Sequence, residues 1–188
     1  NPLKRPPINI VNQGIEAIRN YFKELESQGE EYVYEAKIIL VGEPGGGKTS
    51  LARKLLDPEY CLKPTEPMTK GLNILKWYFL YNKNTKFTAN IWDFGGQEIM
   101  HAIHHFFLTK RSLYIVLADN RKEDTNFYYW LHMAEIFGGK SPVIIVINEK
   151  FNYKKYVPAD IVESFPCIID IFKINLSNNT GLLDLTNA

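Results

Sequence analysis

Residues 42–49 read GEPGGGKT, and side chains of these types in this order can bind phosphate. The stretch matches the pattern G-x-x-x-x-G-K-[ST], directly after an apolar run and before a helical segment. Its glycines allow a loop whose N–H groups point inward, and the following helix adds the positive end of its dipole. We expect Lys48 to reach the β- and γ-phosphates of a nucleotide and Thr49 to ligate Mg²⁺. The nucleotide-binding residues predicted in this loop are Gly42, Glu43, Pro44, Gly45, Gly46, Gly47, Lys48 and Thr49.

A second motif, WDFGGQE at residues 92–98, follows a strand-like segment. We expect Asp93 to hold Mg²⁺ at the end of that strand and the Gly96 N–H to contact the γ-phosphate. Gln97 is expected to orient an attacking water, so Gln97 and Lys48 are the predicted catalytic residues. The alternative is a simple turn after an edge strand, but the motif supplies the second half of the magnesium site that the first motif requires.

Between these motifs lies a polar segment, residues 63–71, in which a threonine can complete the Mg²⁺ shell and close over the γ-phosphate. Thr65 and Thr69 both qualify. We choose Thr69, because Gly71 and a strand beginning at Leu72 follow it and place its hydroxyl at the entrance of that strand. The predicted metal ligands are therefore Thr49, Thr69 and Asp93.

The segments that must position these residues alternate between strands and helices. Near-continuous apolar runs, such as residues 37–42, 113–119 and 143–148, are typical of parallel strands buried on both faces. Residues 72–81 and 86–94 flank a short turn-rich stretch and predict an antiparallel hairpin with one strand at the sheet edge. The pattern predicts an α/β fold with a mostly parallel six-stranded sheet and helices on both faces.

The sequence pattern predicts one domain with an N-terminal appendage. Residues 1–33 combine a proline-rich start with an amphipathic helix, whose apolar positions include Ile15, Ile18 and Phe22. Residues 34–188 form the main domain, and its last helix is expected to be cut short.

Composition limits the function and the location. The 188 residues are 45% hydrophobic with a net charge of +1, which gives no basic excess for nucleic acid. Cys61 and Cys167 lack metal-ligand spacing, and no apolar run reaches the length of a transmembrane segment. We expect a cytoplasmic protein without a nucleic-acid partner.

With these motifs in place, the chain resembles the Ras-like small GTPases, and within them the Roc GTPase domain of Roco proteins. The resemblance lies in residues 92–131, above all in the phrase FFLTKRSLYIVL at residues 106–117. Residues 1–25 resemble the closing turn of a leucine-rich repeat array and the helix that joins it to Roc.

The resemblance implies a Ras-like P-loop GTPase fold and a GTP-binding, GTP-hydrolysing switch that uses Mg²⁺ and is slow in isolation. It implies that Ser50 touches the α-phosphate, that Thr69 belongs to the first switch, and that Asp93, Gly96 and Gln97 belong to the second. It also implies a multidomain parent with leucine-rich repeats before this domain and a COR domain after it, through which the protein dimerises. Two alternatives are a nucleotide-operated interaction module with negligible hydrolysis and an ATP-using phosphotransferase.

Base selection is the open question. GTPases select guanine with N-K-x-D after a buried strand, but here Asn148 precedes Glu149, Lys150 and Phe151, and the aspartate is missing. Glu149 can replace the aspartate only from a position two residues early. The site can instead have weak base selectivity, or a segment that carries the aspartate belongs after Asn148 and is absent from the sequence. We favour the absent segment and keep Asn148 as a guanine-site residue.

Overall fold

The computed structural model describes residues 5–28, 33–63, 69, 71–83, 85–95, 109–120, 125–150 and 155–188. The chain divides into two compact units, residues 1–33 and 34–188. The interpretation of the first unit as the tail of a repeat array, and of the last helix as truncated, stays a prediction. None of the helices in the described ranges combines the length and the apolar character that crossing a bilayer requires.

The first unit contains two helices, α1 (Ile8–Val11) and α2 (Ile15–Gln28). The expected amphipathic helix is α2, which begins at the first predicted apolar position. Ile15 and Phe22, two residues of its apolar face, are exposed.

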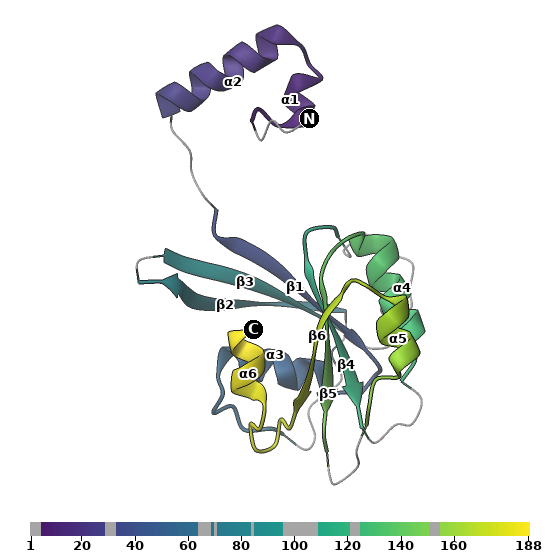
Figure 1. Cartoon of the computed structure of the whole chain (residues 1–188). Coiled ribbons are helices and arrows are strands. Elements are labelled where there is room, and N and C mark those ends of the chain that lie inside the picture. Colours follow the sequence, from purple (N-terminus) through teal and green to yellow (C-terminus); the bar gives the residue numbers. More distant parts are fainter. Residues whose placement is uncertain are drawn as a thin grey trace. The chain divides into compact units, whose positions relative to one another are not determined.

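The second unit is built on a six-stranded sheet in the order β2-β3-β1-β4-β5-β6 (Figure 1). β2 and β3 are antiparallel, and every other neighbouring pair is parallel, as the sequence predicted. The strands are β1 (Glu35–Gly42), β2 (Leu72–Asn82), β3 (Thr85–Phe94), β4 (Leu113–Asp119), β5 (Val143–Asn148) and β6 (Ile168–Ile174). The helices are α3 (Lys48–Leu56), α4 (Phe127–Gly138), α5 (Ala159–Ser164) and α6 (Leu182–Asn187).

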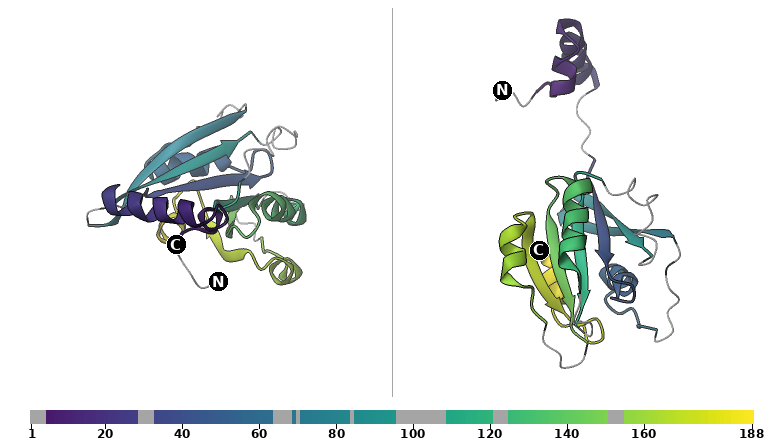
Figure 2. Two further views of the ribbon diagram at one scale, coloured as in Figure 1. Left: turned by 90° about the horizontal axis from the view of Figure 1, so that it is seen from above. Right: turned by 90° about the vertical axis from the view of Figure 1, so that its right-hand side faces the viewer.

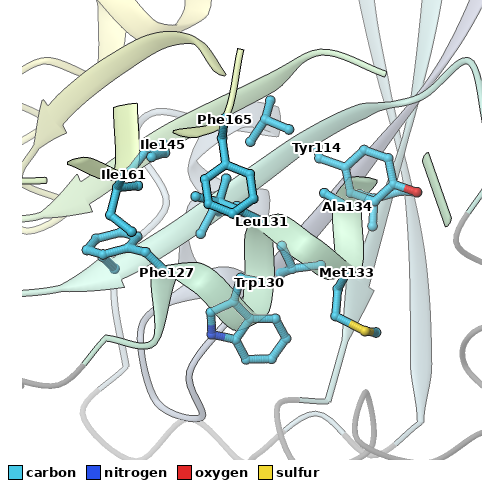
Figure 3. Close-up of a cluster of buried hydrophobic side chains, with 14 of the residues drawn as sticks. Tyr114, Phe127, Trp130, Leu131, Met133, Ala134, Ile145, Ile161 and Phe165 are labelled. Atoms are coloured by element: carbon cyan, nitrogen blue, oxygen red, sulfur yellow. The ribbon is translucent and has the colours of Figure 1, made fainter. Parts of the chain in front are cut away.

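Helices cover both faces of this sheet, with α4 and α5 on one face and α3 and α6 on the other (Figures 1 and 2). Successive residues of a strand point to opposite faces, so each central strand contributes to two cores. In β1, Ile39 and Val41 pack with α4 and α5, whereas Ile38 and Leu40 pack with α3 and α6. Figure 3 shows side chains that α4 and α5 contribute to the first of these two clusters. Packing on both faces explains why the central strands read as continuous apolar runs.

The strand order changes direction at β1, which has β3 on one side and β4 on the other. In parallel α/β sheets, ligands bind beyond the carboxyl ends of the strands at such a point. Gly42 ends β1 there, with φ +138°, and a Cβ on it would lie 2.2 Å from the Leu117 carbonyl oxygen. Only glycine fits this close approach of β1 to β4, and the loop after β1 starts from it.

We expect Leu131→Ala in α4 to lower the free energy of unfolding by about 2–5 kcal/mol, because Leu131 is fully buried between α4 and the sheet. Ile136→Ala on the same helix is the matched control: Ile136 is 69% exposed, and its replacement should cost less than about 0.5 kcal/mol. Urea unfolding of the two variants measures both values. Equal losses would contradict the assignment of this helix face to the core.

Candidate functional site

The loop between β1 and α3 curls around the Lys48 side chain. Lys48 is the first residue of α3, and its buried ammonium donates to the carbonyl oxygens of Gly42 at 2.9 Å and Glu43 at 3.1 Å. The Gly46 N–H donates to the same Glu43 oxygen at 3.1 Å and tightens the turn. Gly47 has φ 103° at the start of α3. These contacts hold a cation inside the loop beside a helix N-terminus, which is an arrangement suited to phosphate.

The three predicted metal ligands meet beside this loop, although they come from three separate segments. The Thr49 hydroxyl donates to Asp93 Oδ2 at 2.6 Å and lies 2.7 Å from the Thr69 hydroxyl oxygen. The Thr69 hydroxyl also donates to Asp93 Oδ2, at 3.3 Å. The structure therefore brings together two hydroxyls and one carboxylate that the sequence separates by 20 and 44 positions.

This oxygen set fits Mg²⁺. The second carboxylate oxygen, Asp93 Oδ1, is buried and has no hydrogen-bond partner among the residues that the structure describes. A buried polar atom without a partner is costly, and a cation would satisfy it. Over the same residues, no group of three or more His, Cys, Asp or Glu side chains could form a metal cage. Mg²⁺ is commonly held by one or two carboxylates together with phosphate oxygens and waters, which matches what Asp93 and the hydroxyls offer.

Burial disfavours the ionised form of Asp93, whereas nearby hydroxyl groups and positive charges favour it. Burial raises the pKa of its carboxyl above the ordinary value. The hydrogen bond from Thr49, the charge of Lys48, the hydrogen bond from Thr69 and the charge of Arg53 act in the opposite direction. A cation at this position would therefore favour the ionised form.

Asn148, the predicted guanine-site residue, lies against the phosphate loop. It ends β5, and its side-chain Nδ2 donates to the Gly46 carbonyl oxygen at 3.2 Å. A Cβ on Gly47 would lie 2.9 Å from the same nitrogen. Asn148 Oδ1 is buried and without a hydrogen-bond partner within the described ranges. The contact links the end of β5 to the loop after β1.

The chain after Asn148 turns toward the end of β4. The Lys150 N–H donates to Asn120 Oδ1 at 2.7 Å, and the Lys150 ammonium lies 3.4 Å from Asp119 Oδ2. The Lys155 ammonium donates to the Asp119 carbonyl oxygen at 3.2 Å. Residues 151–154 lie outside the described residues, and the segment that we favoured as absent after Asn148 stays a prediction.

Glu149 does not take the place of the missing aspartate. Its N–H donates to the Ile174 carbonyl oxygen at 2.7 Å and so extends the pairing of β5 with β6 by one residue. Side chains alternate along a strand, so the Glu149 side chain leaves the face on which Asn148 contacts the loop. The fully buried Asp119 pairs in register with Asn148, so it shares that face, but Lys150 already contacts its carboxylate. No sequence pattern predicts this Asp119–Lys150 pair, because it depends on the register of β4 with β5.

A second contact that the sequence did not predict involves Glu43. The indole N–H of Trp130, on α4, donates to Glu43 Oε1 at 3.1 Å. Glu43 was predicted as a nucleotide-binding residue, and the structure places its side chain against α4 instead of inside the loop. Its backbone oxygen remains part of the loop.

Several predicted residues are not placed by these contacts. Gly96 and Gln97, with the alternative Thr65, lie outside the described residues. Ser50 is half-buried in the first turn of α3, and its role at the α-phosphate stays a prediction, as does the role of Pro44.

Comparison with known proteins places this architecture in context. The family model described as "Ras of Complex, Roc, domain of DAPkinase" matches residues 37–150. A Dictyostelium discoideum protein named probable serine/threonine-protein kinase pats1 is 34% identical over 163 residues, which are 77% of this chain and 5% of that protein. A Roc-COR-CHAT protease of Runella zeae is 38% identical over 138 residues, which are 63% of this chain and 15% of that protein.

One solved structure covers most of the chain. It is described as Methanosarcina barkeri Roco2 RocCORdC bound to GDP, and it matches with a TM-score of 0.76 and 39% identity. The match covers 89% of this chain and 51% of that chain. The present chain therefore spans about half of the chain in the Methanosarcina barkeri structure and a much smaller part of the two relatives.

We expect Asp93→Asn to stabilise the nucleotide-free, Mg²⁺-free protein, and to do so more at high pH than at low pH. Because the pKa of Asp93 is raised in the folded state, its contribution to stability is complete below the ordinary Asp value of about 3.9. It is lost as the pH rises through that value and the raised folded pKa. The asparagine cannot ionise, so the melting temperatures of variant and parent should diverge from about pH 4 to about pH 8.

The matched control for this experiment is Asp170→Asn, which removes an exposed carboxylate on β6. Because this carboxylate is exposed, its replacement should change the melting temperature little. An Asp93→Asn variant that is less stable than the parent at about pH 8 would contradict the assigned cost of burying the charge.

Proposed function

The chain belongs to the Roc domains of Roco proteins, a Ras-like GTPase family, and from that premise we propose that it binds GTP and GDP with Mg²⁺ and hydrolyses GTP. The observation that carries the proposal is the meeting of Thr49, Thr69 and Asp93 beside the Lys48 ammonium. A cation position and a phosphate position lie next to each other there. GDP in the Methanosarcina barkeri structure supports the guanine nucleotide as ligand.

Each residue has a distinct part in this proposal. Lys48 exchanges one or both of its carbonyl contacts for phosphate oxygens, and the loop N–H groups cradle the phosphates. Thr49, Thr69 and Asp93 would hold Mg²⁺, directly or through water, and the bound ion would supply positive charge to offset that of the phosphates. Gln97 orients the attacking water, and the Gly96 N–H contacts the γ-phosphate.

Thr69 is the residue through which the site can act as a switch. It lies between the loop after α3 and the start of β2, and its hydroxyl contacts reach both Thr49 and Asp93. A threonine that joins the metal shell only while the γ-phosphate is present releases its segment after hydrolysis. We propose that this release is the conformational output of the domain.

The parent protein is proposed from the names of the relatives. The Runella zeae protein and the Methanosarcina barkeri structure both carry Roc together with COR in their descriptions. We propose that this chain likewise belongs to a multidomain Roco protein with leucine-rich repeats and a COR domain, that it dimerises through COR, and that it is cytoplasmic.

We expect Lys48→Ala to abolish binding of fluorescent GDP and to abolish multiple-turnover GTP hydrolysis, because the variant loses the buried cation of the phosphate loop. The matched control is Lys140→Ala, which removes an exposed lysine just before the amino end of β5, at the opposite end of that strand from Asn148. Tight binding with no turnover in the parent would favour the interaction module without hydrolysis. Unchanged binding in Lys48→Ala would contradict the proposed phosphate site.

Base selectivity gives an independent test. A site built to hydrogen-bond a substrate rejects an analogue without those groups by about 10⁴–10⁵. Phe151 stands where N-K-x-D has its aspartate, so we expect GDP to be preferred over ADP by less than about 10³. Displacement of fluorescent GDP by unlabelled GDP and ADP measures the ratio. Equal displacement would overturn the GTPase reading in favour of an ATP-using enzyme, and a ratio above about 10⁴ would require another base-reading carboxylate.

A further inference from the structure

Glu43 introduces a negative charge into a loop that must accept negative phosphates. It is the first residue after β1, next to Gly42, and it precedes the turn that surrounds Lys48. A carboxylate close to a polyphosphate is repelled, and the repulsion is stronger where protein shields the pair from water. A phosphate loop with glutamate at this position therefore needs a way to direct the side chain elsewhere.

The backbone and the side chain of Glu43 face opposite ways. Its carbonyl oxygen accepts from the Gly46 N–H and from the Lys48 ammonium, both at 3.1 Å, and so belongs to the inner turn. Its carboxylate accepts from the Trp130 indole N–H on α4 at 3.1 Å. One residue thus closes the phosphate loop with its backbone and attaches it to α4 with its side chain.

The donor is fixed in place by the core. Trp130 is 2% exposed and packs in the hydrophobic cluster between α4 and the sheet, where Figure 3 shows it beside the other α4 side chains. The Tyr129 ring meets it edge-on at 4.8 Å between centroids. The pKa of Tyr129 is raised, first by burial and then by the negative charge of Glu43, which agrees with a carboxylate directed toward α4. Asn126 is the N-cap residue of α4, and its side-chain oxygen accepts from the Tyr129 N–H at 3.0 Å.

We propose that Trp130 is a positioning residue for the phosphate site: its indole N–H holds the Glu43 carboxylate against α4 and keeps that charge away from the bound phosphates. The inference rests on the proposed nucleotide-binding function. It assigns to a core residue of α4, 87 positions from Glu43, a part in nucleotide affinity. Without the indole N–H, the carboxylate is free to turn toward Lys48 and the loop N–H groups and to compete with the phosphates.

The test is a double-mutant cycle on the full chain, with the affinity for fluorescent GDP in the presence of Mg²⁺ as the readout. Trp130→Phe removes the N–H and should weaken binding about tenfold, the order expected when one hydrogen bond to a charged group is lost. Glu43→Gln keeps the acceptor oxygen and removes the charge, and should bind GDP more tightly than the parent, because no carboxylate is left to repel the phosphates. The double variant should match Glu43→Gln within about threefold, because no charge remains to be held away.

Two observations separate this role from a structural one. If Trp130 only fills the core, Glu43→Gln will not rescue the double variant, and that result overturns the proposal. Raising the salt concentration should also shrink the ratio of parent to Trp130→Phe affinity, because salt screens the freed carboxylate. A ratio that is the same at about 0.1 M and about 1 M salt contradicts a charge effect.

The controls keep the two proposals distinguishable. Trp77→Phe alters a partly buried tryptophan on β2 and should bind GDP like the parent. A parent that does not bind GDP at all would refute the proposed function. A parent that binds, together with a Trp130→Phe variant that is folded and binds equally well, would refute only the role of Trp130. Melting temperatures of all variants establish which of them are folded.

Discussion

The hydrogen bonds that converge on the Asp93 carboxylate are the constraint on which the rest of the site depends. They join the end of β3, the first turn of α3 and Thr69, three positions before β2, so three segments must reach one point. A buried carboxylate is costly without such partners, and one of its oxygens still lacks one among the described residues. The site is thus assembled around a charge that burial disfavours and that a cation would stabilise.

The sheet explains how this assembly is possible. Parallel strands end at the same edge, and the reversal of strand order at β1 leaves room there for the loop after β1. The approach of Gly42 to Leu117 fixes where the loop begins, and Asn148 holds its middle from the end of β5. Trp130 then attaches the loop to α4 on the other face. The phosphate loop therefore contacts elements on both faces of the sheet. One hydrogen bond joins it to β5 and another joins it to α4.

Local patterns were sufficient to predict the fold and to single out the residues that meet beside the loop after β1. The alternation of apolar strands with helices gave the mixed sheet, because strands covered by helices on both faces must be apolar along their length. The choice of Thr69 over Thr65 rested on its position directly before a strand, and the structure places Thr69 against Asp93. The residues that would select the base were harder to predict, since several explanations of a missing aspartate agree equally well with the sequence. The structure adds the contacts of Lys150 with Asp119 and Asn120, and the absent segment stays a prediction.

The sequence by itself determined the order of strands and helices, the glycine-rich loop after β1 and the oxygens that we propose bind Mg²⁺, because each depends on neighbouring residues or on a fixed local spacing. Only the tertiary structure decided which side chain opposes which across strands and helices. Lys150 and Asp119 are 31 positions apart, and Trp130 and Glu43 are 87 apart. Such pairs depend on strand register and on how a helix sits against the sheet. Strand register and helix placement are set by the packing of the whole core, and they cannot be predicted from the spacing of residues along the chain.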